Sequence, residues 1–412
     1  MKKLDVFFQR DKWDKFIVGQ LALNNNRIFF EYDTNFMLKP LYLSPFKLPP
    51  EIRFHEHKDR AFGPNFGLFD DSLPDGWGLL LMDRFLTNKG FTTSEISVLD
   101  RLAFLGSSTM GSLIYEPPFE RQTVDHSICD IHSLAKQSQK IFSGTSNEVI
   151  PQLMRAGGSP GGAWPKILVG IHGDKIISGE NDLPDAYEHW MIKFSSMGAS
   201  NDSGAVEYAY SLMAKAANIH MTETRLFHTD QKDHFFGIKR FDRQGSRRFH
   251  VHTFGNLIHA NFRIPSCDYE QFLKVVRILT ANHQDVKRGF SQMVFNVLAN
   301  NRDDHVKNFA FIMDDDGEWA LSPAYDLTFA HGPGGEHSMT LLQEGRSPHK
   351  KEIQQLGKIA GLNDKEIKSS IEQVINAVEQ WRKYAQIAGV SNKSQKEITS
   401  VIQKNLTTVL CR

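Results

Sequence analysis

Alternating apolar and polar positions at the start of the chain predict a small antiparallel sheet. Three β-type runs, LDVFF, KFIVGQLAL and RIFFEY, follow one another, and an Asn24-Asn25-Asn26 turn separates the last two. Farther on, DSLPDGWGLLLMDRFL places Pro and Asp ahead of an apolar run, which is typical of a helix start. We therefore expect a β-rich N-terminal subdomain over residues 1–118.

From about residue 119 the pattern changes to helices and strands around a glycine-rich stretch, RAGGSPGGAWPK. KILVGIHGDKIIS predicts a hairpin. HWMIKFSS alternates, so that Trp190, Ile192 and Phe194 share one face and Lys193 lies on the other. GAVEYAYSLMAKAANI has helical spacing, and HFFGIKRFDR is a further apolar strand. These elements predict a lobe built around a second sheet.

Amphipathic helices dominate the rest of the chain, in YEQFLKVVRILT, in GFSQMVFNVLANN and in much of 350–410. A sheet-rich lobe before a helix-rich lobe is the order found in kinases, although many other α+β proteins share it. The predicted fold is α+β: two protein-kinase-like lobes over 119–412, divided near residue 242, with the β-rich subdomain added in front and a helical C-terminal lobe.

Composition narrows the possible functions. Lys plus Arg equals Asp plus Glu at 48 each, which argues against a protein whose main task is to coat nucleic acid. Cys129, Cys267 and Cys411 are far apart, so neither a disulfide framework nor a cysteine zinc site is indicated. We find no apolar stretch typical of a signal peptide or long enough to span a bilayer. We expect a cytoplasmic protein.

The most specific chemistry lies in NNRDDHVKNFAFIMDDDGEWALSPAYDLTFA, residues 300–330. Phosphoryl transfer needs one carboxylate to orient the attacking hydroxyl, and an amide oxygen and a second carboxylate to hold magnesium. In protein kinases the catalytic Asp precedes the metal-binding Asn by five positions, as Asp303 precedes Asn308. FAFIM and EWALS, joined by an acidic turn, predict a hairpin that returns Asp326 towards Asn308. An isolated D-x-x-x-x-N is more often a solvated turn, and we read the triple-Asp turn itself as an exposed loop.

The glycine-rich stretch has two readings. Gly157 and Gly162 have the separation of a P-loop, but Ala163 stands where that motif requires Lys, so a P-loop NTPase is disfavoured. Small residues would let backbone N–H groups approach phosphates, and Lys166 adds charge nearby. A flexible surface loop is the alternative. His250 and His252 could both face a metal from one strand, but no third ligand is evident.

GGSPGGAWPK, MIKF, IKRFDR, DDHVKNF and PAYDL, in this order, resemble the HipA family of serine/threonine kinases from bacterial toxin–antitoxin pairs. LFDDSLPDGWG and FLGSSTMGSLIYEP resemble that family's N-terminal subdomain, so the resemblance covers almost the whole chain. Many relatives carry Arg-Pro-Lys where this chain has Trp164-Pro165-Lys166. This departure leaves the charge and packing of the loop open.

The resemblance implies a role for particular residues. Asp303 matches the catalytic aspartate, Asn308 and Asp326 match the metal ligands, and Lys193 matches the nucleotide-phosphate lysine, with Glu207 as its candidate partner. Nucleotide contacts are also implied for the glycine loop, for a hinge that meets adenine through its backbone, and for residues around the metal ligands: Gly161, Gly162, Ala163, Trp164, Pro165, Lys166, Lys239, Arg240, Phe241, His305, Lys307 and Tyr325. Ser159 matches an autophosphorylated serine.

The expected function is an ATP- and Mg²⁺-dependent serine/threonine protein kinase, the toxin of a toxin–antitoxin pair. The resemblance implies a translation protein such as an aminoacyl-tRNA synthetase as substrate. It also implies a HipB-like antitoxin as partner, and contact with DNA only through that antitoxin. Two alternatives stay open: a nucleotide-binding or antitoxin-binding module whose catalysis is weakened, and a small-molecule kinase.

Overall fold

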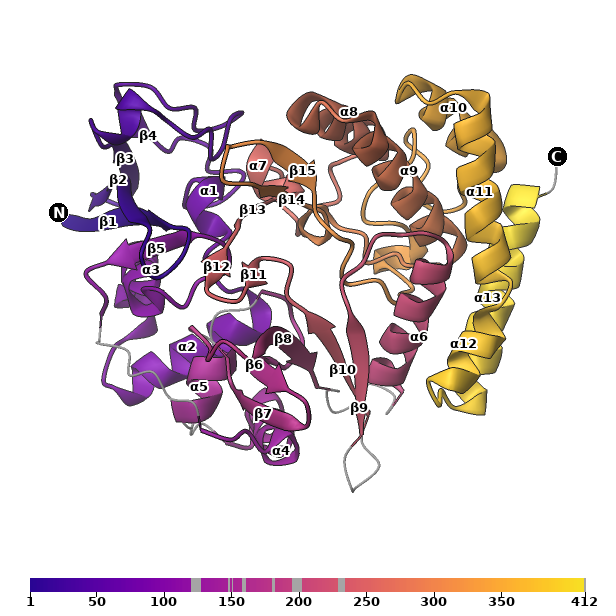
Figure 1. Ribbon diagram of the computed structural model, residues 1–412, viewed down its shortest axis with the longest axis horizontal. Coiled ribbons are helices and arrows are strands. Elements are labelled where there is room, and N and C mark those ends of the chain that lie inside the picture. Colours follow the sequence, from indigo (N-terminus) through magenta and orange to yellow (C-terminus); the bar gives the residue numbers. More distant parts are fainter. Residues whose placement is uncertain are drawn as a thin grey trace.

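The computed structural model of the protein describes residues 1–119, 127–146, 149, 151–157, 161–179, 182–194, 202–228 and 234–410. The chain begins with an antiparallel sheet in the order β4-β3-β2-β1-β5 (Figure 1). Its strands are β1 (Lys2–Gln9), β2 (Lys15–Asn24), β3 (Arg27–Tyr32), β4 (Phe54–Glu56) and β5 (Leu113–Glu116). Helices α1 (Gly67–Asp70), α2 (Gly76–Asn88) and α3 (Val98–Leu105) lie between β4 and β5 in the chain. The predicted strands and helix are present.

A second antiparallel sheet, in the order β7-β6-β8-β10-β9, lies at the lower centre of Figure 1. Its strands are β6 (Lys166–His172), β7 (Lys175–Ser178), β8 (Glu188–Lys193), β9 (Thr224–His228) and β10 (His234–Lys239). Helices α4 (Ile131–Phe142) and α5 (Pro151–Gly157) precede the sheet in the chain, and α6 (Ser203–Ala216) follows β8. Burial alternates along β8 as predicted, with Trp190 and Ile192 buried and Lys193 half-buried.

The C-terminal half is mainly helical, as predicted, and lies at the right of Figure 1. Its helices are α7 (Phe254–Ile258), α8 (Tyr269–Thr280), α9 (His283–Leu298), α10 (Lys350–Ile359), α11 (Asp364–Val378), α12 (Trp381–Ile387) and α13 (Asn392–Leu410). Two small sheets accompany them, β11 (Arg243–Gln244) with β12 (Arg247–Arg248), and β13 (His250–Thr253) with β14 (Ala310–Met313) and β15 (Trp319–Leu321). The β14–β15 pair is the predicted hairpin before Asp326.

Two hydrophobic cores hold these elements together. The larger core joins the first sheet to α6 and to the C-terminal helices. The smaller core lies under the second sheet, and α2 belongs to it: Trp77 and Leu81 pack with Ile167 and Trp190. Helix α2 precedes residue 118 yet is buried against the second sheet, and the domain boundaries at 118 and 242 stay predictions.

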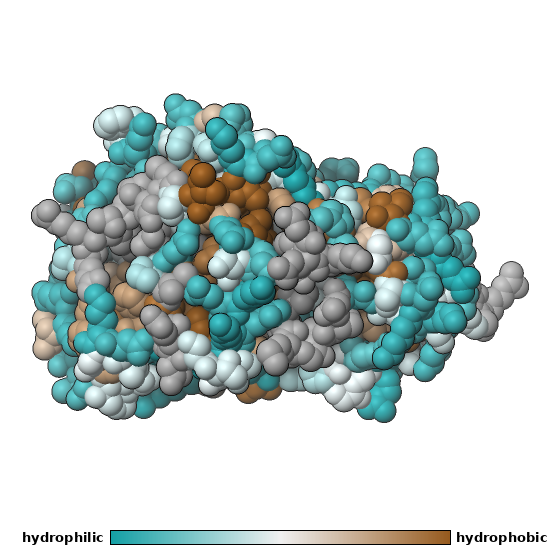
Figure 2. Space-filling view, turned by 90° about the horizontal axis from the view of Figure 1, so that it is seen from below, coloured by the Kyte–Doolittle hydropathy of each residue, from teal (hydrophilic) through white to brown (hydrophobic). Residues whose placement is uncertain are grey.

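The surface agrees with amphipathic C-terminal helices. In Figure 2 the end of the molecule that these helices form is mostly hydrophilic, whereas larger apolar patches lie nearer the other end. In the part of the chain that the structure describes, no helix is both long enough and apolar enough to cross a membrane.

Candidate active site

The predicted phosphate lysine stands at the centre of a cluster of charges. Lys193, at the end of β8, donates from Nζ to Glu207 Oε1 on α6 at 2.5 Å and forms an ion pair with Asp326. The expected pairing of Lys193 with Glu207 is therefore present. Burial lowers the pKa of Lys193, but the two carboxylates outweigh burial and raise it above its ordinary value. Lys193 is therefore charged at neutral pH.

Asp326 lies in an unusual backbone conformation beside this lysine. Its φ of 55° is in the left-handed region, which a non-glycine residue adopts at a cost and which is common at functional sites. Burial raises the pKa of Asp326, but Lys193 and Lys166 outweigh burial and lower it to about 2. Tyr325, its neighbour, donates from its hydroxyl to the carbonyl of Lys307 at 2.6 Å, and so holds this segment against the stretch around Asn308.

Asp303 and Asp304 are adjacent in sequence but lie in opposite environments. The side chain of Asp303 is 60% exposed. Partial desolvation raises its pKa, and Asp326 and Asp304 add to the rise, although solvent screens much of this effect at so exposed a group. Asp304 is buried and accepts hydrogen bonds from the Tyr269 hydroxyl at 2.6 Å and the Ser338 amide at 2.7 Å. Only Asp303 can therefore meet a substrate hydroxyl.

The donor set of Asn308 and Asp326 fits magnesium. Asn308 donates from Nδ2 to the carbonyl of Asp303 at 2.6 Å, and among the described residues its Oδ1 accepts no hydrogen bond. A free amide oxygen and an ionised carboxylate are hard oxygen ligands, which magnesium prefers. The carboxylate of Asp326 is held by Lys193 from one side only, and its side chain is 36% exposed. The residues present could thus supply two ligands and leave the rest to water and phosphate.

The glycine loop brings a second lysine to the same place. Lys166 opens β6 and lies opposite Lys193 in the β6–β8 ladder. Its Nζ donates to the carbonyl of Gly161 at 2.6 Å. Burial lowers the pKa of Lys166 to about 8, although Asp326 opposes the change. The other predicted loop residues lie beside it, with Ala163 against α2, Trp164 at 52% exposure and the Pro165 carbonyl accepting from the Phe194 amide at 2.8 Å.

The predicted hinge lies at the end of β10, and its contact with adenine stays a prediction, but one of its side chains differs from the expectation. Side-chain identity was expected to matter little at Lys239, Arg240 and Phe241. Arg240 is in fact buried, and its guanidinium is paired with the equally buried Asp242 at 2.7 Å. A buried charge needs its partner, so this side chain cannot be exchanged freely. The rings of Phe241 and Tyr325 lie 5.7 Å apart, and in the described part of the chain the Phe241 amide has no backbone hydrogen-bond partner.

His305 and Lys307 lie within the catalytic stretch, residues 303–308. Nδ1 of His305 accepts from the Lys307 amide at 3.2 Å, so the proton of a neutral ring is on Nε2, which lies 4.0 Å from Asp303 Oδ1. The ring therefore lies close to Asp303 but beyond hydrogen-bonding distance of it. Lys307 Nζ lies 3.2 Å from Asp70 Oδ2 and 3.9 Å from Asp75 Oδ2, both in the N-terminal subdomain. Burial lowers the pKa of Lys307, but these carboxylates outweigh burial and raise it.

Several functional contacts were missed at the sequence level. The acids of LFDDSLPDGWG reach the site: Asp70 and Asp75 meet Lys307, and the Asp75 carboxylate accepts from the Gly162 amide. The signal was the density of acidic residues in this short segment, although sequence alone named no partner for them. Ser159 lies outside the described residues.

The two histidines considered as metal ligands instead lie within hydrogen-bonding distance of other protein groups. His250 Nε2 lies 3.0 Å from the carbonyl of Leu43. His252 lies between Asp71 Oδ2, 2.5 Å from Nδ1, and Ser44 Oγ, 3.0 Å from Nε2, and it is fully buried. In the described ranges no group of three or more His, Cys, Asp and Glu side chains is arranged to hold a metal, so these histidines do not belong to a set of three ligands. These rings therefore join β13 to the N-terminal subdomain.

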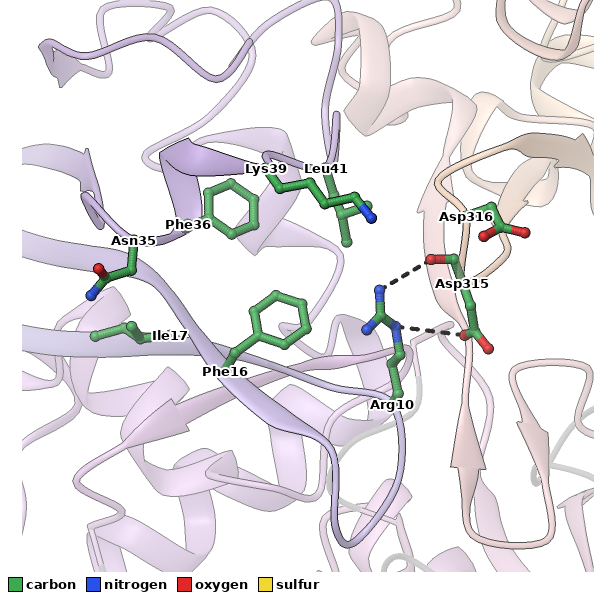
Figure 3. A pocket seen from close by; sticks show the side chains of 9 residues that line it. All are labelled: Arg10, Phe16, Ile17, Asn35, Phe36, Lys39, Leu41, Asp315 and Asp316. Atoms are coloured by element: carbon green, nitrogen blue, oxygen red, sulfur yellow. Dashed lines mark hydrogen bonds and ion pairs between the residues drawn. The ribbon is translucent and has the colours of Figure 1, made fainter.

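A separate pocket lies where the first sheet meets the β14–β15 turn (Figure 3). The rings of Phe16 and Phe36, with centroids 6.3 Å apart, line its apolar side. Arg10 closes the other side by donating to the Asp315 carbonyl at 3.1 Å. None of its lining residues belongs to the predicted site. The acidic turn is exposed, as predicted, but Asp315 ties it to the N-terminal subdomain.

The chain matches two family models and is similar to a curated protein. A family model described as the HipA-like C-terminal domain matches residues 158–382, and one described as the HipA N-terminal domain matches residues 12–116. The chain is similar to "Putative kinase Y4dM" of Sinorhizobium fredii, with 28% identity over 153 residues, 34% of this chain and 36% of that protein. The chain thus matches about a third of the length of this curated relative.

One solved structure matches nearly the whole chain. It is described as the Shewanella oneidensis MR-1 toxin–antitoxin system HipA, HipB and its operator DNA complex. The TM-score is 0.70 at 13% identity, and the match covers 98% of this chain and 96% of that chain. At this identity the likeness is one of fold, and it confirms the predicted α+β fold with two kinase-like lobes and an added N-terminal subdomain.

Proposed function

The chain belongs to the HipA family, and from this premise we propose that it is an ATP-dependent serine/threonine protein kinase. One observation carries the proposal: Lys193 is paired with both Glu207 and Asp326, beside the exposed Asp303. In protein kinases a lysine paired with a helix glutamate and an aspartate that holds magnesium must both be in place for phosphoryl transfer, and Lys193, Glu207 and Asp326 can fill these three positions. Among the described residues Asn308 Oδ1 accepts no hydrogen bond, so this oxygen is available to a metal ion.

In this proposal each group has one task. Lys193 and Lys166 attract the nucleotide phosphates. Asp303 orients the acceptor hydroxyl and takes its proton as the oxygen bonds to phosphorus and ADP leaves. Asn308 and Asp326 would hold magnesium, which when bound neutralises charge on the phosphates. His305 has a supporting role, with its Nε2 4.0 Å from Asp303 Oδ1.

The base of the nucleotide would lie near Phe241 and Tyr325. Flat rings favour stacking with another flat ring. The Phe241 amide, which has no backbone partner among the described residues, offers a hydrogen bond to an acceptor on the base. The Lys239 and Arg240 amides are already used, by the carbonyls of Glu223 and His189 at 2.9 Å each. Base recognition at the hinge would therefore depend mainly on Phe241.

A partner and a substrate belong to the same proposal. The solved neighbour comes from a complex of HipA, HipB and operator DNA, which supports a HipB-like antitoxin as partner and contact with DNA through that antitoxin. The substrate we propose is a translation protein, such as an aminoacyl-tRNA synthetase, modified in the cytoplasm. No residue of this chain identifies that substrate.

We also propose that Ser159 is autophosphorylated and that this switches the enzyme off. A phosphate there adds about two negative charges to a segment that lies seven positions before Lys166 in the sequence, and these charges would compete with the nucleotide phosphates. Intact mass spectrometry after incubation with MgATP should show added phosphate on the wild type, and none on Ser159→Ala or Asp303→Asn. A wild type that phosphorylates a substrate without gaining phosphate itself would contradict the switch.

The decisive experiment is incubation of purified protein with labelled ATP, with and without cell lysate. Label transferred to a protein supports the proposal, and Asp303→Asn should abolish it. Label transferred only to small molecules would identify a small-molecule kinase. Binding of ATP with no transfer would indicate a module whose catalysis is weakened.

A further inference from the structure

We propose that Asp75 is a positioning residue that holds the glycine loop (residues 161–166) in register with the catalytic stretch. The inference rests on the proposed function, in which this loop binds the nucleotide. Asp75 belongs to the N-terminal subdomain and precedes the first residue of α2. It would act on the nucleotide only through Gly162 and Lys307.

Residues at the start of α2 form hydrogen bonds with both backbone polar groups of Gly162, its N–H and its C=O. The Asp75 carboxylate accepts a hydrogen bond from the Gly162 amide. The Trp77 amide donates to the Gly162 carbonyl at 3.0 Å. A third contact reaches the end of the loop, where the Trp77 indole Nε1 donates to the Lys166 carbonyl at 3.1 Å. The loop is thus fastened at two points to one helix.

This contact needs glycine on both sides. Gly76 has a φ of +38°, and a Cβ there would lie 2.6 Å from Ala163 Cα and 2.7 Å from the Gly162 carbonyl oxygen. At Gly76 backbone can approach backbone this closely only because no side chain intervenes. Gly162 needs glycine for a different reason: its φ of +100° is a conformation that other residues rarely adopt, whereas the atom nearest to an added Cβ, Lys166 Nζ at 2.0 Å, is the end of a flexible side chain. The Lys166 ammonium therefore lies directly beside Gly162.

The second oxygen of Asp75 faces the other half of the site. It lies 3.9 Å from Lys307 Nζ, and Lys307 precedes the proposed metal ligand Asn308. The side chains of Asp75 and Lys307 are only 18% and 15% exposed, so water screens their attraction weakly. One carboxylate therefore touches both the glycine loop and the catalytic stretch, which belong to different lobes.

Helix α2 can serve as a rigid support. Trp77 is fully buried in the core of the second sheet, so the residue that grips the loop cannot shift without disturbing that core. Sites held by packed secondary structure are positioned more accurately than sites held by loops alone. The N-terminal subdomain thus takes part in building the nucleotide site.

The test compares Asp75→Ala and Asp75→Asn with a control, Asp83→Asn. Asp83 lies on the same helix but pairs with Arg101, away from the loop. Hydrogen exchange of residues 161–166 is measured without nucleotide, and KM for ATP and kcat are measured separately. In Asp75→Ala we expect loop exchange about tenfold faster and a KM raised about fivefold, with a smaller fall in kcat. Asp75→Asn keeps an acceptor for Gly162 but loses the charge facing Lys307, so its values should be intermediate.

The outcomes separate this inference from the proposed function. If the wild type transfers phosphate and Asp75→Ala matches it in loop exchange and KM, the inference is wrong and the function stands. If the wild type neither binds ATP nor transfers phosphate, the proposed function fails, while the exchange data still decide whether Asp75 holds the loop. If Asp75→Ala does not fold, Asp75→Asn decides: values equal to those of the wild type would overturn the proposal.

Discussion

Two residues of the same type that lie next to each other in this protein can differ in their chemistry, because their burial and their charged partners differ. Asp303 and Asp304 are adjacent, yet one carboxylate faces solvent and the other is enclosed by hydrogen-bond donors. Lys193 and Lys166 lie opposite each other on paired strands, yet the pKa of Lys193 is raised by two carboxylates whereas that of Lys166 is lowered by burial. Each difference predicts a separable effect of mutation.

The first prediction concerns the aspartates. Asp303→Asn and Asp326→Asn should lower kcat by at least about 100-fold while the protein stays folded, because each removes a charge without changing volume. Asp304→Asn should affect kcat of the folded protein much less, but it should lower the free energy of unfolding by about 3 kcal/mol, because it disrupts a buried set that includes His337. Kinase assays and urea denaturation check both. Equal loss of kcat at all three positions would contradict the choice of Asp303 over Asp304, which rests on the five-residue spacing to Asn308.

The second prediction concerns pH. With a pKa of about 8, Lys166 is charged below that pH and becomes neutral as the pH rises through it. Bound phosphates favour the charged form, so KM for ATP should rise above about pH 8, by up to about tenfold per pH unit. Lys166→Met should bind ATP weakly at neutral pH and lose this dependence. The same profile in wild type and variant would assign the effect to another group.

Among the elements, the segment 107–111 shows how the N-terminal subdomain is fastened to the rest of the molecule. The Gly111 amide donates to Asp242 Oδ2 at 2.9 Å, and Arg243 donates to the Thr109 carbonyl at 2.7 Å. Asp242 lies buried between Arg240 and Arg243. Burial raises the pKa of Asp242, but the two guanidinium groups outweigh burial and hold it below its ordinary range.

The third prediction follows from this cluster. Asp242→Ala should lower the free energy of unfolding by about 3–5 kcal/mol, because it leaves buried guanidinium groups unpaired. Asp315→Ala, which removes an exposed partner of Arg10, should cost at most about 1 kcal/mol. Because the folded pKa of Asp242 is depressed, its contribution is present above about pH 4 and is lost as the pH falls further. Denaturation at several pH values checks the difference, and equal costs at both positions would contradict it.

Local pattern predicted the elements well, because hydrophobic periodicity is imposed by burial of one face. It correctly predicted the alternation of burial along β8, the hairpin before Asp326 and the C-terminal helices. It could not give contacts between residues far apart in sequence, such as Asp75 with Gly162 or Asp71 with His252. Nor could it show that Arg240 is buried, because strand-end arginines are usually solvated.

For the whole molecule, the site depends on segments from all parts of the chain. The N-terminal subdomain supplies Asp70 and Asp75, the second sheet supplies Lys166 and Lys193, and the helical lobe supplies Asp303. A ligand that binds this arrangement only when the molecule is folded must stabilise the entire fold.

The fourth prediction is therefore a thermal shift. Millimolar MgATP should raise the melting temperature, by an amount that grows with the logarithm of its concentration above Kd. Lys193→Ala should reduce the shift. No measurable change at saturating MgATP would favour a degenerate pocket.

Trp164 makes the glycine loop visible to spectroscopy. Of the tryptophans, Trp13 and Trp164 are the exposed pair at 85% and 52%, whereas Trp77, Trp190, Trp319 and Trp381 are buried. Collisional quenchers such as iodide should therefore reach only the indoles of Trp13 and Trp164. In a Trp13→Phe protein the quenchable emission would come from the loop alone. Protection of that emission would report occupancy of the site without a label or a coupled assay.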